Sequence, residues 1–216
     1  MSAAVSTSLA DRLADLGDID PSRIRCDPAP GQATVEDLLR IRQFDGRRYE
    51  LVDSTLVEKI MGWKESLLAG VLLQWLLNFL DENTIGVATG ADGMSRLFGT
   101  TVRGPDVAFV SWARLPGGRI PTEPIPDLVP DFVIEVLSKG NTRGEMSRKR
   151  REYFQAGVGS LWMVDPRNRT VAIYQTADQV AIACEGEIIE AGPMLPGWTV
   201  DTAALFAKLD QQAPSP

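Results

Sequence analysis

Two short stretches of the sequence each place one acidic residue inside an otherwise apolar strand pattern. The first is "RGPDVAFV", residues 103–110, with Asp106, and the second is "DFVIEVLSKG", residues 131–140, with Glu135. Alternation along the second stretch puts apolar side chains on both faces, so we expect a central, buried strand. One face carries Phe132, Ile134 and Val136, and the other carries Asp131, Val133, Glu135 and Leu137. An ionised carboxylate buried without a partner costs several kcal/mol, so Glu135 must be paired, protonated or bound to a cation.

The chemistry that suits this pair of acids is metal-assisted phosphodiester hydrolysis. Carboxylates from two adjacent strands can hold Mg²⁺, which takes hard oxygen ligands and keeps several waters. Such a metal polarises a phosphodiester and lowers the pKa of an attacking water. A cationic side chain beside it would orient the nucleophile and stabilise the charge that develops on phosphate. The alternative is that Glu135 forms a structural ion pair with a lysine or arginine of the following helix.

Composition narrows the chemistry further. The 216 residues include no histidine, which excludes Ser-His and Cys-His nucleophiles, histidine zinc sites and histidine general bases. The net charge of −7 gives no global attraction to nucleic acid, so a polyanion must be met by a local basic patch or by metal ions. Cys26 and Cys184 lack the number and spacing of a disulfide framework or zinc site, which favours a reducing cytoplasm. The N-terminus has no signal-peptide core, and the apolar run 67–80 is too short for a bilayer, so we expect no membrane association.

The elements that must position the two acids follow from spacing and turn signals. The length favours one domain, residues 34–208, after an N-terminal extension, residues 1–33, that is partly flexible and before a flexible tail, residues 209–216. Thr34 and Asp37 form a capping-box pattern, and a hairpin is expected to turn near Asp53. We expect helices over 35–44 and about 64–80, a polar helix that ends at Gly157, and a short helix after Asp201. We expect strands over 84–90, 95–99, 101–110, 131–138, 160–165 and 170–175, and near 180–183 and 187–189. This order predicts a mixed α/β sandwich whose central sheet is covered by helices.

At this point the motifs carry a family resemblance. Roughly residues 35–207 resemble the Uma-type family of putative endonucleases, in the PD-(D/E)XK restriction-endonuclease-like superfamily. The stretches that carry the resemblance are "YELVDSTLVEK" at 49–59, "RGPD" at 103–106 and "FVIEVLSKGNTRGEMSRKRREYFQAGVGSLWMVDPRNRTVAIY" at 132–174. The resemblance implies a restriction-endonuclease-like central mixed β-sheet flanked by helices, with an extra N-terminal hairpin and C-terminal strands. It also implies a Mg²⁺-dependent enzyme acting on DNA, with Mn²⁺ as a substitute. Asp106 matches the PD half of the motif, and Glu135 matches the acid of the second half.

The catalytic lysine departs from the superfamily pattern. That pattern has lysine two residues after the acid, where this chain has Leu137. The Uma-type family supplies the lysine from the following helix, which matches Lys149 here. Helical spacing puts Lys149 on one face with Glu145 and Tyr153, so it can reach back to Glu135. The alternative is a structural salt bridge between the same two residues; Lys139, at the strand exit, is the second candidate for the lysine.

Other charged residues have two interpretations each. Glu65 matches a third acid that the superfamily draws from its first core helix, although acids near helix N-termini are favoured by the macrodipole regardless of function. Glu50 falls where the family usually has Glu, but it also fits an ordinary polar position of a hairpin. Asp165 is expected only to end a strand. The run "RKRR", residues 148–151, either meets phosphates or forms a solvated helix face.

We therefore predict a Mg²⁺-dependent endonuclease acting on DNA. Asp106, Glu135 and Glu65 would bind the metal, and Lys149 would position the water or stabilise the transition state. One alternative is a catalytically silent DNA-binding or protein-interaction module, which the net negative charge and Leu137 in the usual lysine position favour. A second alternative is a hydrolase of a smaller phosphoester. A homodimer is expected if the enzyme cuts both strands of a duplex, because that needs two active sites.

Overall fold

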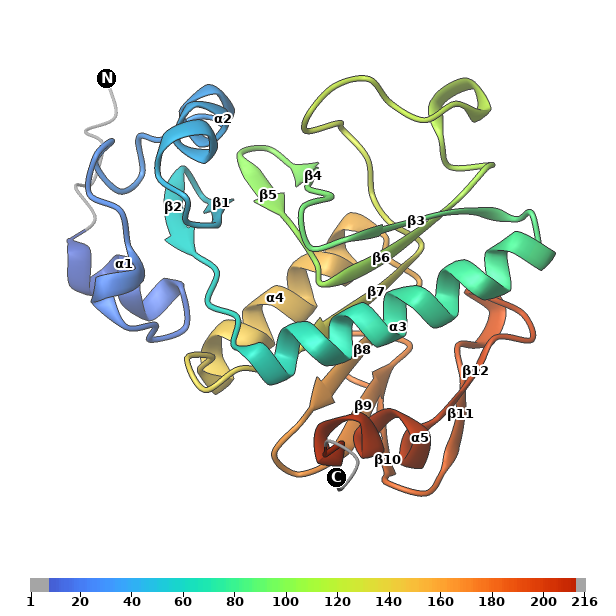
Figure 1. The fold of residues 1–216 in the computed structure, drawn as a ribbon. Coiled ribbons are helices and arrows are strands. Elements are labelled where there is room, and N and C mark those ends of the chain that lie inside the picture. The colour runs from blue at the N-terminus through green and yellow to red at the C-terminus, as the bar shows by residue number, and fades with distance from the viewer. Residues whose placement is uncertain (1–7, 213–216) are drawn as a thin grey trace.

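The computed structural model describes residues 8–212 and shows a mixed α/β fold with sheets between helices (Figure 1). The helices are α1 (Leu9–Asp15), α2 (Val35–Phe44), α3 (Trp63–Glu82), α4 (Arg143–Ala156) and α5 (Thr202–Phe206). The strands are β1 (Tyr49–Val52), β2 (Thr55–Glu58), β3 (Gly86–Gly90), β4 (Ser95–Phe98), β5 (Thr101–Arg103), β6 (Val107–Ser111), β7 (Phe132–Val136), β8 (Ser160–Asp165), β9 (Thr170–Tyr174), β10 (Val180–Cys184), β11 (Ile188–Glu190) and β12 (Thr199–Asp201). They form a six-stranded sheet in the order β10-β9-β8-β7-β6-β3, a four-stranded sheet in the order β2-β1-β5-β4, and the pair β11-β12.

The strand β7 lies inside the six-stranded sheet, as the sequence predicts. It pairs antiparallel with β6 and parallel with β8, and all its residues are buried. Parallel neighbours cannot be joined by a tight turn, and α4 makes the crossover from β7 to β8. The face of β7 with Phe132 and Ile134 packs under α3, whereas the face with Val133 packs against side chains of α4 (Figure 1).

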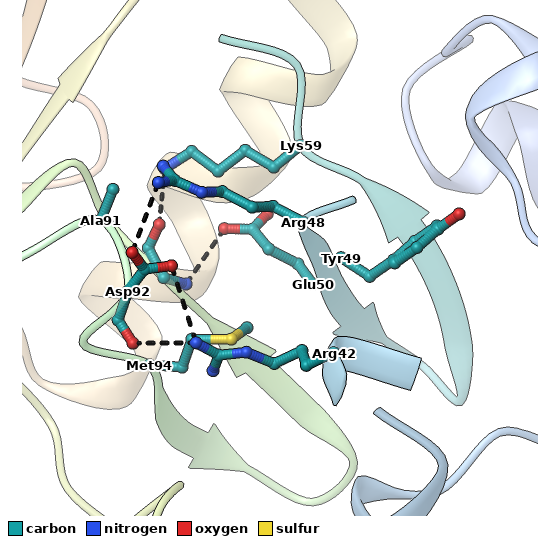
Figure 2. A pocket seen from close by; sticks show the side chains of 9 residues that line it. Arg42, Arg48, Tyr49, Glu50, Lys59, Ala91, Asp92 and Met94 are labelled. Atoms are coloured by element: carbon teal, nitrogen blue, oxygen red, sulfur yellow. Dashed lines mark hydrogen bonds and ion pairs between the residues drawn. The ribbon is translucent and has the colours of Figure 1, made fainter. Parts of the chain in front are cut away.

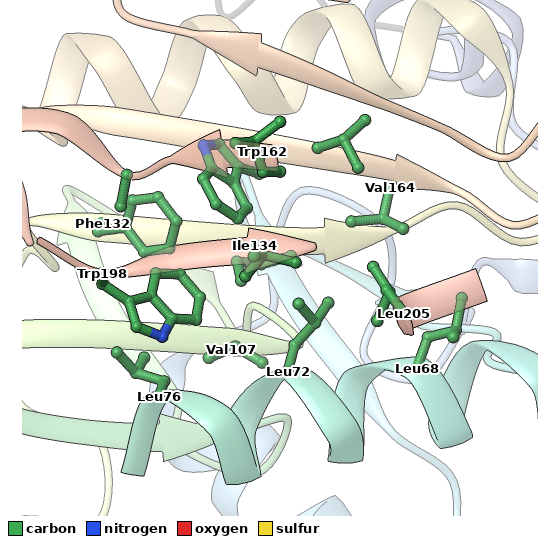
Figure 3. Close-up of a cluster of buried hydrophobic side chains, with 14 of the residues drawn as sticks. Leu68, Leu72, Leu76, Val107, Phe132, Ile134, Trp162, Val164, Trp198 and Leu205 are labelled. Carbon is green, nitrogen blue, oxygen red and sulfur yellow. The ribbon is translucent and has the colours of Figure 1, made fainter. Parts of the chain in front are cut away.

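The largest apolar layer lies between α3 and the six-stranded sheet (Figure 3). Its centre is aromatic: Phe132 meets Trp162 edge to face with centroids 5.1 Å apart, and Trp198 stacks on Trp162 at 5.4 Å. Each such pair adds roughly 0.5–1.5 kcal/mol beyond the area it buries. The buried α3 residues that complete the layer are Leu68, Ala69, Leu72, Leu76 and Leu80. Neither α3 nor another helix within residues 8–212 is both long and apolar enough to cross a membrane.

Local signals correctly predicted α2 and the β1-β2 hairpin, whereas α1 was not among the expected helices. Thr34 caps α2 in a reciprocal capping box with Asp37. The β1-β2 hairpin turns at Asp53 and Ser54, which both have positive φ (45° and 55°), as a two-residue type I′ turn requires. Residues 8–33 pack onto this hairpin, where Ile24 forms a β-bridge with Val57 and shares its small core. Residues 1–7 and 213–216, the ends of the expected extension and tail, lie outside the described residues.

One expectation about the strands was wrong, and the error matters for the site. The stretch 101–110 was expected as one strand, but it forms β5 and β6, which belong to different sheets. The break is at Gly104 and Pro105: the Gly104 N–H donates to the side chain of Glu50, and proline has no N–H to donate. Two successive residues therefore contribute no donor to a ladder, and the chain crosses from the four-stranded to the six-stranded sheet. Asp106 follows this crossing directly.

Candidate active site

Five charged side chains converge where the two sheets meet. They are Glu50 from β1, Lys59 just after β2, Asp106 from the β5-β6 crossing, Glu135 from β7 and Lys149 from α4. Asp106 and Glu135 are each only 2% exposed. Of these residues, Asp106, Glu135 and Lys149 were predicted from the sequence. Glu50 was left between two interpretations, and Lys59 was missed.

The register of β6 and β7 brings the two acids together. Val107 pairs with Ile134, so the next positions in this antiparallel register are Asp106 and Glu135. Asp106 Oδ2 accepts a hydrogen bond from the Val136 N–H at 2.7 Å, which fixes the carboxylate against β7. Its other oxygen, Oδ1, is buried and faces Lys59.

The ammonium group of Lys59 lies between the two acids. Its Nζ is 2.7 Å from Asp106 Oδ1 and 3.4 Å from Glu135 Oε2. It also donates a hydrogen bond to the Gly104 carbonyl. Figure 2 shows the Lys59 side chain from the neighbouring pocket. Burial alone would lower the pKa of Lys59, but Glu135, Asp106 and Glu50 raise it above its ordinary value, so the side chain is a cation. Burial also raises the pKa of Asp106, because Lys59 offsets only part of the desolvation and Glu135 adds repulsion. The position that a metal was expected to take is therefore occupied by a lysine nitrogen.

Lys149 reaches back from α4 as its helical position predicted. Its Nζ is 3.0 Å from Glu135 Oε1 and 3.1 Å from Glu50 Oε1. One turn later on the same helix face, the Tyr153 hydroxyl donates to Glu135 Oε1 at 2.6 Å. Burial, followed by repulsion from Glu135 and Glu50, raises the pKa of Tyr153 well above its ordinary value. The phenol therefore stays protonated and acts as the hydrogen-bond donor to Glu135. Glu135 Oε1 is thus engaged by α4, and Oε2 faces Lys59.

An outer ring of charges holds Glu50 in place. Arg103 Nη1 lies 2.7 Å from Glu50 Oε2, and the same guanidinium forms an ion pair with Glu152. Burial would raise the pKa of Glu50, but Lys149, Arg103 and Lys59 hold it well below its ordinary value. The four cations Lys59, Arg103, Arg148 and Lys149 face the four carboxylates Glu50, Asp106, Glu135 and Glu152. Arg148 also pairs with the exposed Asp53. Each of the four buried carboxylates therefore has at least one protein cation as its partner.

The structure does not bring Glu65 to this cluster. Its side chain lies in the first turn of α3, where its carboxylate sits beside the backbone of the preceding Gly62. Within residues 8–212, no three acidic or cysteine side chains gather in a way that suits a metal ion. The expected role of Glu65 as a metal ligand thus stays a prediction that no described contact supports. Lys139 is exposed at the exit of β7, while Leu137, in the usual lysine position, joins the apolar layer under α4.

The basic run on α4 faces the protein more than the solvent. Arg148 pairs with Glu152 and Asp53, and Lys149 belongs to the cluster. Arg150 lies over the Tyr174 ring, 4.8 Å from its centroid. Three of the four residues thus contact other side chains of the protein, and Arg151 is exposed. Asp165, as expected, ends its strand, and its carboxylate accepts hydrogen bonds from the turn that follows.

Comparisons with known proteins establish the family and the fold of the chain. The family model described as Uma2, putative restriction endonuclease, matches residues 35–204, well over half of the chain. A crystal structure described as a putative nuclease from Anabaena variabilis superposes with a TM-score of 0.70 at 19% sequence identity, over 82% of this chain and 98% of that one. At this identity the likeness shows the fold, which is the restriction-endonuclease-like fold predicted above. No curated protein matches the chain.

Proposed function

The chain belongs to the Uma2 family of putative restriction endonucleases, and we propose that it hydrolyses DNA phosphodiester bonds at the buried cluster, with Mg²⁺ as cofactor. One observation carries the proposal. Asp106 Oδ1, just before β6, and Glu135 Oε2, in β7, point at the same cation position, while the second oxygen of each acid is held by hydrogen bonds. A structural ion pair needs only one carboxylate for one lysine, and two buried acids aimed at one point suit a divalent charge better.

The residues present fit a magnesium ion. Two carboxylate oxygens are the hard ligands that Mg²⁺ prefers, and waters and a substrate phosphate complete its shell. When bound, the ion would polarise the scissile phosphate and lower the pKa of an attacking water. Lys59 competes for the same two oxygens. Its side chain is 11% exposed, against 3% for Lys149, so it has more room to withdraw.

The protein side chains then have distinct tasks. Tyr153 and Lys149 orient Glu135 through its Oε1. Lys149, held in turn by Glu50, lies where it can stabilise negative charge that develops on a phosphate beside Glu135. Lys59, once released from the acids, is a second cation for the same phosphate, because its stem already ends inside the cluster.

The test is hydrolysis of supercoiled plasmid DNA by the wild type and by Glu135→Gln. With Mg²⁺ or Mn²⁺, the wild type should nick the plasmid, and the variant should lose on the order of 100-fold or more of this rate, because a neutral amide replaces a charged metal ligand. The matched control is Glu145→Gln, which removes another buried carboxylate that pairs with Arg23 outside the cluster. The control should nick DNA at the wild-type rate. Equal nicking by wild type and Glu135→Gln would refute the proposal.

The pairing of every buried acid in the cluster with a protein cation favours a second candidate, the catalytically silent module. If Lys59 fills the position permanently, the protein needs no metal, and the scaffold serves only to bind DNA or a protein. Calorimetric titration with Mg²⁺ separates the two candidates. The nuclease requires binding that Asp106→Asn removes, whereas the silent module shows no binding before or after the substitution.

A further inference from the structure

A small pocket opens next to the cluster and is bordered by three cationic side chains. Its volume of about 10 Å³ leaves room for about one water molecule. Figure 2 shows Arg42, Arg48 and Lys59 around it, with Glu50 at its inner side. Three elements supply the cations: α2 carries Arg42, and the two arms of the β1-β2 hairpin carry Arg48 and Lys59. In a chain with a net charge of −7, this concentration of positive charge is local.

The hairpin forces two of these cations to face each other. Tyr49 pairs with Glu58, and the Lys59 N–H donates to the Arg48 carbonyl at 2.8 Å, so Arg48 and Lys59 are the next pair in the ladder. Like charges directly opposite each other on a sheet are destabilising. Asp106 and Glu135 form ion pairs with Lys59 and neutralise its charge. Arg48 therefore requires a different anion as its partner.

One carboxylate meets both arginines across the pocket. Asp92, in the loop between β3 and β4, has Oδ2 3.3 Å from Arg48 Nη2 and Oδ1 3.6 Å from Arg42 Nη2 (Figure 2). The Asp92 side chain is 68% exposed, and surface ion pairs of this kind contribute only about 0–1 kcal/mol each. Asp92 therefore holds the arginines weakly, in competition with any stronger anion that reaches them.

We propose that Arg42 and Arg48 form a binding site for a backbone phosphate of the nucleic-acid substrate, and that Asp92 occupies this site until that phosphate displaces it. A phosphodiester carries one negative charge, as the Asp92 carboxylate does, and guanidinium groups bind phosphate with strong, paired hydrogen bonds. The site borders Lys59, so the bound phosphate lies near the one that would be cleaved. The identity of the substrate rests on the proposed nuclease function.

Binding of a short fluorescein-labelled DNA duplex, followed by anisotropy with a chelator present, tests the site without hydrolysis. Asp92→Asn should tighten binding severalfold, because it removes the negative charge that competes for the two arginines. Arg42 keeps its hydrogen bond to the backbone carbonyl of residue 92, so the substitution tests the carboxylate alone. Arg42→Ala with Arg48→Ala should weaken binding about tenfold and reduce the slope of log K against log salt by about one for each phosphate that the protein no longer neutralises. In the double arginine variant, adding Asp92→Asn should change nothing.

The matched control is Asp127→Asn. It removes the same charge from an aspartate that does not line the pocket and whose side chain is 76% exposed. Asp127 Oδ1 lies 2.9 Å from Arg96 Nε. This control should bind DNA as the wild type does, within about twofold. The proposal is overturned if Asp92→Asn fails to tighten binding, if it tightens binding equally without the arginines, or if Asp127→Asn has the same effect.

The outcome is separable from that of the nuclease test. If Glu135→Gln nicks DNA as the wild type does while the arginine dependence holds, the phosphate site stands and the catalytic assignment falls. If Glu135→Gln abolishes nicking while Asp92→Asn leaves binding unchanged, the phosphate site falls alone.

Discussion

Consecutive residues of β7 enter two different environments. Ile134 points towards α3, into the apolar layer of Figure 3, and is fully buried. Glu135 points the other way, to the lysines and the tyrosine of the cluster, and is 2% exposed. Burial alone does not distinguish the two faces, because both side chains are almost inaccessible to water.

The two faces differ in what burial does to stability. Each apolar side chain under α3 stabilises the fold by roughly 1.5–3 kcal/mol through the surface that it removes from water. Each ion in the cluster loses hydration, and a buried ion pair often contributes no more than apolar residues of the same volume. Stability therefore explains the α3 face, whereas the cluster requires another reason, which the proposed catalysis supplies.

The largest expected effect on stability comes from removing one cation of the buried charged cluster. Arg103→Met leaves the buried acids Glu50 and Glu152 without their shared cation, and it should lower the free energy of unfolding by about 3–5 kcal/mol in urea titrations. The control, Arg96→Met, breaks a half-exposed ion pair with Asp127 and should cost less than about 1 kcal/mol. A loss below about 1 kcal/mol for Arg103→Met would show that the cluster relaxes around the missing charge.

Substitutions on the apolar face should lower the free energy of unfolding but leave the rate of DNA hydrolysis unchanged. Leu72→Ala should cost about 3 kcal/mol, because the fully buried side chain leaves a cavity under α3. On the same helix, Leu77 is 41% exposed, and Leu77→Ala should change stability by no more than about 0.5 kcal/mol. Both variants should nick DNA at the wild-type rate below their melting temperatures. A catalytic defect in Leu72→Ala would mean that the two faces are coupled through β7.

Lys59 offers a smaller and sharper test of the charged face. Lys59→Met removes the cation that competes for Asp106 and Glu135, so Mg²⁺ should bind about tenfold more tightly, a gain of about 1.4 kcal/mol. Isothermal calorimetry measures this directly and does not depend on hydrolysis. Unchanged or weaker Mg²⁺ affinity would contradict competition between the lysine and the metal.

The smallest effect concerns a charged pair outside the site. Glu145 is paired with Arg23, and although burial would raise its pKa, the guanidinium lowers it below the ordinary value. A lowered folded-state pKa means that this pair stabilises the protein above the unfolded pKa of about 4.3 and that the contribution fades as pH falls below it. Melting temperatures should therefore fall less steeply on acidification in Glu145→Gln than in the wild type. Parallel curves between about pH 5 and pH 3 would contradict this.

Local patterns in the sequence were sufficient for most elements and for three site residues. Capping, turn residues and the ending at Gly157 correctly placed α2, the hairpin and α4. The stretch 101–110 was read as one strand although Gly104 and Pro105 interrupt its strand-forming residues, and the missing N–H of proline should have been given more weight. Lys59 was missed because no local pattern marks it: its partner Glu135 lies 76 positions further along the chain.

The sequence by itself determined that an acid would be buried on one face of β7, because strand alternation is a local property that assigns neighbouring residues to opposite faces. The family resemblance pointed to Lys149, and helical periodicity showed that this lysine could face the same acid, because helical spacing is local too. Only the tertiary structure decided what neutralises Asp106 and Glu135. Charge pairing depends on distance in space, and the crossing at Pro105 brings together a hairpin, two strands and a helix that share no short sequence pattern.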